Sequence, residues 1–370
     1  MKFHMLTEII FGSGSISQLK RITEKLNATN PLIVTDKGVI NAGIADKVLS
    51  QSKNSTIFDD VEENPKSTTV NRAGELVQEE KPDLIIGLGG GSSMDTAKAV
   101  ALLATNPGKI EEYEGKGQYT NPPLPLLAIP TTCGTGSEVT WVSVITDARR
   151  KFKMSIKGPE MFPAAAIIDP DLICSLPKPL IASTGMDALT HAIEAYTVKP
   201  RTPITDIFAK RSIELIFHSL RPAYKNIKEN KKARENLMLG STLAGIAFGN
   251  SDVGSVHCLA ETIGGLYNVP HGVANSIFLP YVMEFNRPAV NDRYAAIARL
   301  VGIKGTAEKL IEQIKSLSRR LHIPSFSDLN IEEDAFERIA RLSVKNNSNP
   351  SNPREIDTKG YIEILRNAAE

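Results

Sequence analysis

The sequence predicts an α/β protein whose sheet domain comes first and whose second domain consists only of helices. Between residues 31 and 145, short apolar runs alternate with longer amphipathic stretches, which is typical of a parallel sheet covered by helices. Beyond residue 177, extended β-branched runs become rare and long helical patterns follow one another. Two prolines in Leu176–Pro179 interrupt the chain there. We therefore expect a Rossmann-like domain over residues 1–177 and an all-α domain over residues 178–370.

The composition is that of a soluble globular protein with room for two cores. The chain has 370 residues, of which 41% are hydrophobic and 23% are charged. A formal net charge of +1 argues against a nucleic-acid partner, and no apolar run reaches the roughly 18 residues of a membrane span. The first residues lack the layout of a signal peptide. Three widely spaced cysteines predict a reducing compartment, so we expect a cytoplasmic protein.

Short apolar runs mark the strands of the first domain. Asp83–Leu88, for example, has the length and composition of a buried strand and leads directly into three glycines. The expected elements of this domain are strands 32–35, 55–58, 83–88 and 124–129, with helices 65–80 and 94–103. In the second domain we expect helices 183–197, 205–220, 232–248, 253–264 and 291–300, and several more toward residue 369.

The segment Gly89–Lys98 joins a strand to a helix through a glycine turn. Glycines let the backbone approach a phosphate, and the free N–H groups at the start of a helix attract its negative charge. The segment has neither the G-x-G-x-x-G spacing of the standard dinucleotide fold nor the lysine–serine ending of a P-loop. A plain tight turn is the alternative, but three glycines followed by two serines favour a phosphate-binding turn.

A second loop of small residues, Thr131–Ser137, follows the expected strand 124–129. Two such loops at strand ends are what a crevice for an extended cofactor needs. Asp36 follows an earlier strand and is placed to accept hydrogen bonds from an adenosine ribose. Its charge would repel a 2′-phosphate, which favours NAD over NADP. The alternative is a turn-forming aspartate beside Lys37-Gly38, and the sequence leaves both interpretations open.

Three of the six histidines, together with one aspartate, indicate a metal site. Asp187 and His191 are four residues apart and share one face of an expected helix. For this pair alone, a solvent-facing aspartate beside a core histidine is the alternative, but His257 and His271 favour a four-ligand site. One carboxylate and three neutral imidazoles make a divalent cation a good Lewis acid. The ligands do not separate Fe²⁺ from Zn²⁺: affinity favours zinc, and availability in the cell can favour iron.

Taken together, these motifs resemble those of the iron-containing (type III) alcohol dehydrogenases. That family shares a dehydroquinate-synthase-like fold with glycerol dehydrogenases and dehydroquinate synthases. The resemblance runs from about Thr7 to the C-terminal tail. It is carried by four motifs in the family's order, GGGSSMDTAK at 89–98, PTTCGTGSEV at 130–139, GMDALTHAIE at 185–194 and GGLYNVPHG at 264–272.

The resemblance implies a role for each matching residue. The implied metal ligands are Asp187, His191, His257 and His271. The implied cofactor contacts are Asp36 for NAD preference, Asn64 in an Asn-Pro element, Gly90, Gly91 and Ser92 in the pyrophosphate turn, Asp95 facing the nicotinamide side, Thr131, Thr132 and Thr135 along the cofactor, and Lys153 near the nicotinamide ribose.

One position departs from the family pattern. Many relatives carry a second histidine four residues after the third ligand, and here that position is Glu261. On a helix Glu261 shares a face with His257, so we count it among the catalytic residues. It would relay protons, orient His257 or contact a polar substrate. A surface glutamate is the alternative.

The resemblance implies reversible hydride transfer between NAD(H) and a small alcohol or aldehyde, with Fe²⁺ or Zn²⁺ polarising the substrate oxygen. NADP is less favoured than NAD. Relatives are commonly dimers or larger, so we expect a homo-oligomer with no membrane or nucleic-acid partner. Other functions remain open. These are a polyol (glycerol-type) dehydrogenase, a reductase of an anionic aldehyde, a dehydroquinate-synthase-type lyase, and a metal-binding protein without catalysis.

Overall fold

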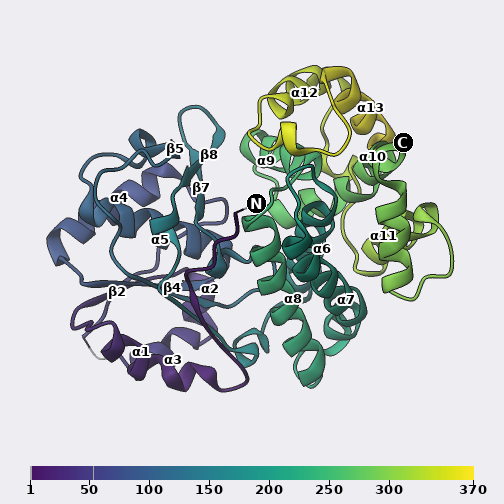
Figure 1. Cartoon of the computed structure of the whole chain (residues 1–370). Coiled ribbons are helices and arrows are strands. Elements are labelled where there is room, and N and C mark those ends of the chain that lie inside the picture. Colours follow the sequence, from purple (N-terminus) through teal and green to yellow (C-terminus); the bar gives the residue numbers. More distant parts are fainter. Residues whose placement is uncertain (1, 53) are drawn as a thin grey trace. The chain divides into compact units, whose positions relative to one another are not determined.

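The computed structural model describes residues 2–52 and 54–370. The chain divides into two compact units, an α/β unit over His4–Ser175 and a helical unit over Leu176–Glu370 (Figure 1). The helical unit also includes Phe3, whose ring stacks on that of Phe208 at 5.7 Å. The predicted fold class, a Rossmann-like α/β part followed by an all-α part, is confirmed.

A six-stranded parallel sheet forms the centre of the α/β unit. Its strand order is β1-β9-β6-β4-β2-β3, and each neighbouring pair is parallel. The strands are β1 (Glu8–Phe11), β2 (Pro31–Val34), β3 (Thr56–Phe58), β4 (Leu84–Gly89), β6 (Leu126–Pro130) and β9 (Ala165–Ile168). Strands β1 and β9 have no counterpart among the expected strands. Both have only four residues, which is too short for a periodic pattern, and most of the side chains of the edge strand β1 are exposed.

The central strands send alternate side chains into two apolar layers. In β2, Ile33 packs against α1 and α3, whereas Leu32 and Val34 pack against α4 and α5 on the other face. Because both faces are covered, the strands are continuous apolar runs. Burying each such side chain stabilises the unit by about 1.5–3 kcal/mol. The helices are α1 (Leu19–Lys25), α2 (Lys37–Asn41), α3 (Ile44–Leu49), α4 (Ser67–Glu80) and α5 (Gly91–Thr105).

A small second sheet lies in the same unit. Its order is β5-β8-β7, with β7 and β8 antiparallel and β5 parallel to β8. The strands are β5 (Gly115–Lys116), β7 (Val142–Asp147) and β8 (Phe152–Lys157). This sheet was absent from the expected elements, and it carries Lys153, one of the predicted cofactor contacts.

The second unit contains only helices within the residues that the structure describes. They are α6 (Lys178–Thr197), α7 (Pro203–Asn226), α8 (Lys231–Gly249), α9 (Ser255–Tyr267), α10 (His271–Leu300), α11 (Ala307–Arg320), α12 (Phe336–Val344) and α13 (Thr358–Ala369). Helix α10 is longer than the expected helix 291–300. It continues through Pro280 and Pro288 and is interrupted only by a kink at Val290. Among the described residues, no helix has the length and apolar character needed to cross a membrane.

Candidate functional site

Three helices of the second unit bring the four predicted metal ligands together. Asp187 and His191 lie on α6, His257 on α9, and His271 at the first position of α10. One ligand atom from each lies within 4.8 Å of the others. The Nε2 atoms of His191 and His257 are 2.9 Å apart, and His271 Nε2 lies 3.8 Å from Asp187 Oδ1. The arrangement is that of a candidate metal centre.

A glycine makes this convergence possible. A Cβ atom on Gly272 would lie 2.6 Å from the carbonyl oxygen of Ser183 and 3.4 Å from Cβ of Asp187. Only a residue without a side chain therefore lets the start of α10 approach α6 this closely. The position follows His271 directly, so this contact fixes where the fourth imidazole enters the site.

The centre is rich in acceptors and poor in positive charge. The amide nitrogen of Asn275 donates to Asp187 Oδ1 at 2.7 Å and also lies 3.1 Å from Nε2 of both His257 and His271. Three acceptors thus meet one amide group, which has only two N–H bonds. A carboxylate and several imidazole lone pairs directed to one point fit a divalent cation. The donor set therefore suits the metal that the sequence predicts.

Glu194 controls the protonation of one imidazole. Its Oε2 lies 2.5 Å from His257 Nδ1, and because an ionised carboxylate only accepts, the ring nitrogen donates. Burial works against a charged His257, but the Glu194 carboxylate outweighs it and raises the pKa of His257 in the metal-free chain. The other ring nitrogen, Nε2, lies 2.9 Å from His191 Nε2 and 3.1 Å from the amide nitrogen of Asn275, so it faces the ligand cluster.

Neither Glu194 nor Asn275 was among the residues predicted from the sequence. Each follows a predicted ligand at helical spacing, Glu194 three residues after His191 and Asn275 four residues after His271. That spacing was the available signal. It did not identify the partner of either side chain, because those contacts join different helices.

Glu261 lies one helical turn after His257 and is half-buried. Its Oε2 accepts a hydrogen bond of 2.6 Å from the amide of Asn346, in the C-terminal segment. The Nδ1 atom of His257 faces Glu194 instead, so orientation of that ring falls to Glu194. The Glu261 charge still acts on His257 electrostatically, where it favours the protonated ring.

The glycine and threonine loops meet in the α/β unit. Gly89 of β4 pairs with Pro130 of β6, so both loops leave the sheet at the same edge. A Cβ atom on Gly91 would lie 2.4 Å from Thr135 Cγ2, and one on Gly90 would lie 3.1 Å from Thr132 Cγ2. A side chain on Gly91 would force Thr135 to move, and one on Gly90 would be tight against Thr132, so the two glycines let the loops pack closely. Gly90 caps α5 and Ser92 lies in its first turn, so the predicted phosphate-binding turn is at a helix N-terminus.

Asp36 has a structural partner on each side. It caps α2 by accepting from the N–H of Val39 at 3.0 Å, and the hydroxyl of Ser93 donates to its other oxygen at 3.1 Å. The turn-forming interpretation of Asp36 is therefore visible in the structure. The contact with Ser93 also holds the carboxylate beside the glycine turn, where the ribose interpretation requires it.

Three further cofactor candidates make defined contacts within the α/β unit. Lys153 on β8 donates to the side-chain oxygen of Asn64 at 2.8 Å, and Asn64 has a left-handed φ of 53°. Asp95 on α5 accepts from the hydroxyl of Ser137 at 2.7 Å and from the N–H of Val144 at 3.0 Å. Burial raises the pKa of Asp95. Both oxygens of Asp95 thus hold the segment that follows the threonine loop.

A buried lysine that the sequence analysis did not single out supports the same segment. Lys98 Nζ donates to the hydroxyls of Ser137 and Thr140 and to the carbonyl of Val142, at 2.8–3.0 Å. Its side chain is 1% exposed, and burial lowers its pKa to about 8. Lys98 and Asp95 therefore anchor residues 137–144 to α5 from the same helix.

Comparison with known proteins identifies the family that shares these features. The profile described as iron-containing alcohol dehydrogenase matches residues 7–170, and that described as Fe-containing alcohol dehydrogenase family, C-terminal, matches residues 181–369. The chain is 40% identical to 1,3-propanediol dehydrogenase of Citrobacter freundii, over 97% of this chain and 96% of that protein. It is 36% identical to NAD-dependent methanol dehydrogenase of Bacillus methanolicus, over 97% of each. A crystal structure of 1,3-propanediol oxidoreductase superposes with a TM-score of 0.95 at 39% identity, covering 99% of both chains.

Proposed function

Because the chain belongs to the iron-containing alcohol dehydrogenase family, we propose that it interconverts a small uncharged alcohol or diol and its aldehyde with NAD(H). Oxidation and reduction at a CH–OH carbon follow from membership of the family. The choice of substrate class and of NAD over NADP is the proposal. The observation that carries it is the convergence of Asp187, His191, His257 and His271 within 4.8 Å.

Each part of the chain has a defined task in this reaction. A divalent cation held by the four side chains supplies a Lewis acid beside the reacting carbon. Asp187 contributes the one negative charge among these ligands. The N-terminus of α5, with Gly90, Gly91 and Ser92, offers N–H donors to the cofactor pyrophosphate. The contact of Lys153 with Asn64 holds the ammonium group near the cofactor-binding segment.

Glu261 supports an uncharged substrate. Its carboxylate is half-buried one turn from His257, and its one hydrogen bond among the described residues comes from the neutral amide of Asn346. No lysine or arginine pairs with it in the part of the chain that the structure describes. An anionic aldehyde approaching this edge of the centre would meet an uncompensated negative charge. The two curated relatives described above bear names of uncharged alcohols, in agreement with this choice.

The charge of Glu261 also bears on the other candidate functions. A polyol substrate stays compatible, because a carboxylate accepts hydrogen bonds from further hydroxyl groups. A reductase of an anionic aldehyde is disfavoured by Glu261. A lyase on this fold would release phosphate and produce no net NADH. A rise in absorbance of the reduced nicotinamide during alcohol oxidation therefore separates it from a dehydrogenase.

The proposal is tested by assays under anaerobic conditions. The chain is loaded with Fe²⁺ or Zn²⁺ and supplied with NADH or NADPH and a panel of short aldehydes. We expect metal-dependent oxidation of NADH that a chelator abolishes, and higher kcat/KM for uncharged than for anionic aldehydes. Failure to reduce any aldehyde with either metal would contradict the proposed function.

We also propose that the chain acts as a homo-oligomer. Leu6, Ile9 and Phe11 are exposed to 61%, 39% and 38%, and they lie in or beside the edge strand β1. An exposed apolar edge strand favours association with another chain. Light scattering should give a mass at least twice the 40.2 kDa of one chain, and replacing Ile9 with Lys should lower it. A monomeric mass for the wild type would contradict this.

A further inference from the structure

Glu194 is a buried carboxylate that joins the candidate metal centre to the interior of the helical unit. It lies on α6, three residues after His191, and is 5% exposed. Its Oε2 accepts from His257 Nδ1 at 2.5 Å, and its Oε1 accepts from the N–H of Val256 at 2.9 Å. The first contact reaches the back of a predicted ligand, and the second holds the start of α9.

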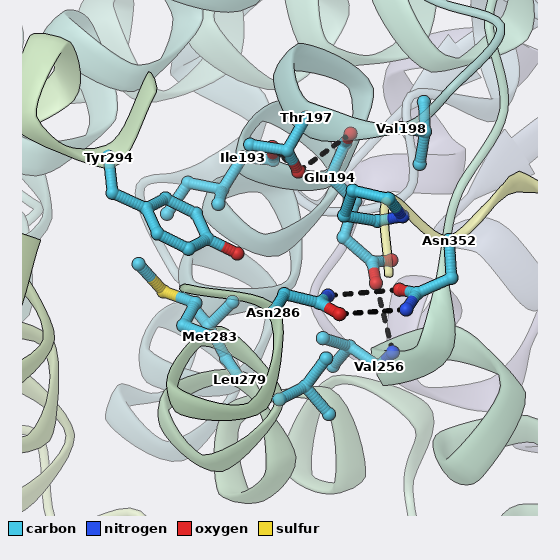
Figure 2. Close-up of a pocket in the computed structure, with 12 residues that line it drawn as sticks. Ile193, Glu194, Thr197, Val198, Val256, Leu279, Met283, Asn286, Tyr294 and Asn352 are labelled. Carbon is cyan, nitrogen blue, oxygen red and sulfur yellow. Dashed lines mark hydrogen bonds between the residues drawn. The ribbon is translucent and has the colours of Figure 1, made fainter. Parts of the chain in front are cut away.

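The surroundings of Glu194 leave its charge without a basic neighbour. In the described residues, its one ion-pair contact is with His257, and no lysine or arginine reaches it. Figure 2 shows the far side of the carboxylate facing a small cavity lined by Thr197, Asn286, Tyr294 and Asn352 together with apolar side chains. The cavity measures about 10 Å³, which is the space of about one water molecule. Bulk solvent therefore does not screen the charge.

The neutral groups around the cavity are already matched with one another. The amides of Asn286 and Asn352 form two reciprocal hydrogen bonds of 3.0 and 2.7 Å (Figure 2). Asn352 Oδ1 also accepts from the N–H of Ser255 at 3.2 Å. These contacts fix the first turn of α9, but none supplies positive charge. An isolated carboxylate in such a place is costly unless a cation compensates it.

We propose that Glu194 is a positioning residue for the metal centre. It keeps the proton of His257 on Nδ1, so that Nε2 presents its lone pair to the cation. Its other oxygen accepts from the N–H of Val256, so the same side chain orients the ring of His257 and holds the first turn of the helix that carries it. Glu194 thereby influences the affinity for the cation through the imidazole of His257.

The experiment measures metal affinity, with a neighbouring carboxylate as the matched control. Glu194→Gln keeps the size of the side chain and removes its charge. Glu261→Gln removes a charge that also acts on His257 but that does not touch its Nδ1. The dissociation constant for Zn²⁺ is measured without NAD, by competition with a chelator. We expect Glu194→Gln to weaken binding about 10–100-fold, and Glu261→Gln to change it less than about threefold.

A second measurement does not depend on any Glu194 variant. With the histidines labelled with ¹⁵N, NMR of the Zn²⁺-loaded wild type reports which ring nitrogen of His257 carries hydrogen, the resonance being assigned through His257→Gln. We expect the proton on Nδ1. A proton on Nε2 would overturn the proposal, as would a Glu194→Gln variant that binds Zn²⁺ within threefold of the wild type.

The inference rests on the proposed metal centre, and its failure can be told apart from the failure of that centre. A wild type that binds no divalent metal overturns both. If the wild type binds metal and Glu194→Gln binds it with the same affinity, only the role of Glu194 is overturned. The melting temperature of each metal-free variant separates a loss of folding from a loss of affinity.

Discussion

Two carboxylates lie near His257, and their surroundings assign them different tasks. Glu194 is buried and lies 2.5 Å from Nδ1 of His257, the contact through which we propose that it orients this ring. Glu261 is half-buried on α9 and accepts a hydrogen bond of 2.6 Å from the amide of Asn346. Glu194 thus contacts the His257 ring directly, whereas Glu261 acts on it only electrostatically, and we propose that Glu261 also repels anionic substrates.

Replacing Glu261 with Gln should change selectivity for substrate charge. The substitution keeps a partner for Asn346 and removes the repulsion of an anionic aldehyde. For a partly exposed charge screened by water, we expect the kcat/KM ratio of glyoxylate to glycolaldehyde to rise about five- to tenfold. Steady-state kinetics with both aldehydes measures it. An unchanged ratio would remove Glu261 from the substrate site.

Asp36 offers a similar test in the cofactor domain. Asp36→Asn keeps an oxygen to cap the Val39 N–H and removes the charge that we expect to repel a 2′-phosphate. The ratio of kcat/KM for NADPH to that for NADH should rise about tenfold, and the melting temperature should change little. A wild type that already prefers NADPH would show that the assignment of Asp36 is wrong.

At the scale of elements, the approach of α10 to α6 determines the geometry of the centre. Gly272→Ala places a methyl group 2.6 Å from the Ser183 carbonyl oxygen, so the two helices must move apart. We expect a loss of about 1–3 kcal/mol in the free energy of unfolding, as for an overpacked core. His271 moves with α10, so Zn²⁺ affinity should fall as well. Scanning calorimetry measures the unfolding free energy and titration calorimetry measures the Zn²⁺ affinity. A Zn²⁺ affinity equal to that of the wild type would show that this contact does not determine the geometry of the metal centre.

Helix α5 holds the segment after the threonine loop through Lys98, and this makes stability depend on pH. The folded pKa of about 8 lies below the unfolded value of 10.5, so between these values the unfolded chain binds more protons. Stability from this group therefore rises as pH increases through that window, by about 1–3 kcal/mol in total.

A variant isolates this effect from other titrating groups. The melting temperature of the wild type relative to Lys98→Met should increase between pH 7.5 and pH 9.5, because the methionine does not titrate. Parallel curves for the two proteins would show that Lys98 has an ordinary pKa.

At the scale of the whole molecule, the sequence predicted the order of an α/β part and a helical part, and the structure and the relatives confirm it. Periodicity was sufficient there because buried strands such as β4 are continuous apolar runs. Strands β1 and β9 were missed because they are short, and the expected helix 291–300 covers only the last part of α10, which continues through two prolines.

The candidate site was likewise predicted only in part from the sequence. Local spacing placed Asp187 with His191, the remaining histidines His257 and His271 extended the pair to a four-ligand site, and the family resemblance matched all four. Glu194 and Asn275 could not be assigned, because their roles depend on contacts between α6, α9 and α10 that no single stretch of sequence encodes. Sequence thus predicts the ligands of the centre better than the side chains that orient them.

The most direct test of the proposed metal-dependent reaction is Asp187→Ala, with bound metal, NADH binding and aldehyde reduction measured on one preparation. The wild type should retain about one divalent metal per chain and reduce an uncharged aldehyde with NADH. The variant should lose both the metal and the turnover, while NADH binding, followed by its fluorescence, stays within about threefold because the predicted cofactor contacts all lie within His4–Ser175. Full activity in the Asp187→Ala variant would contradict the assignment of this centre.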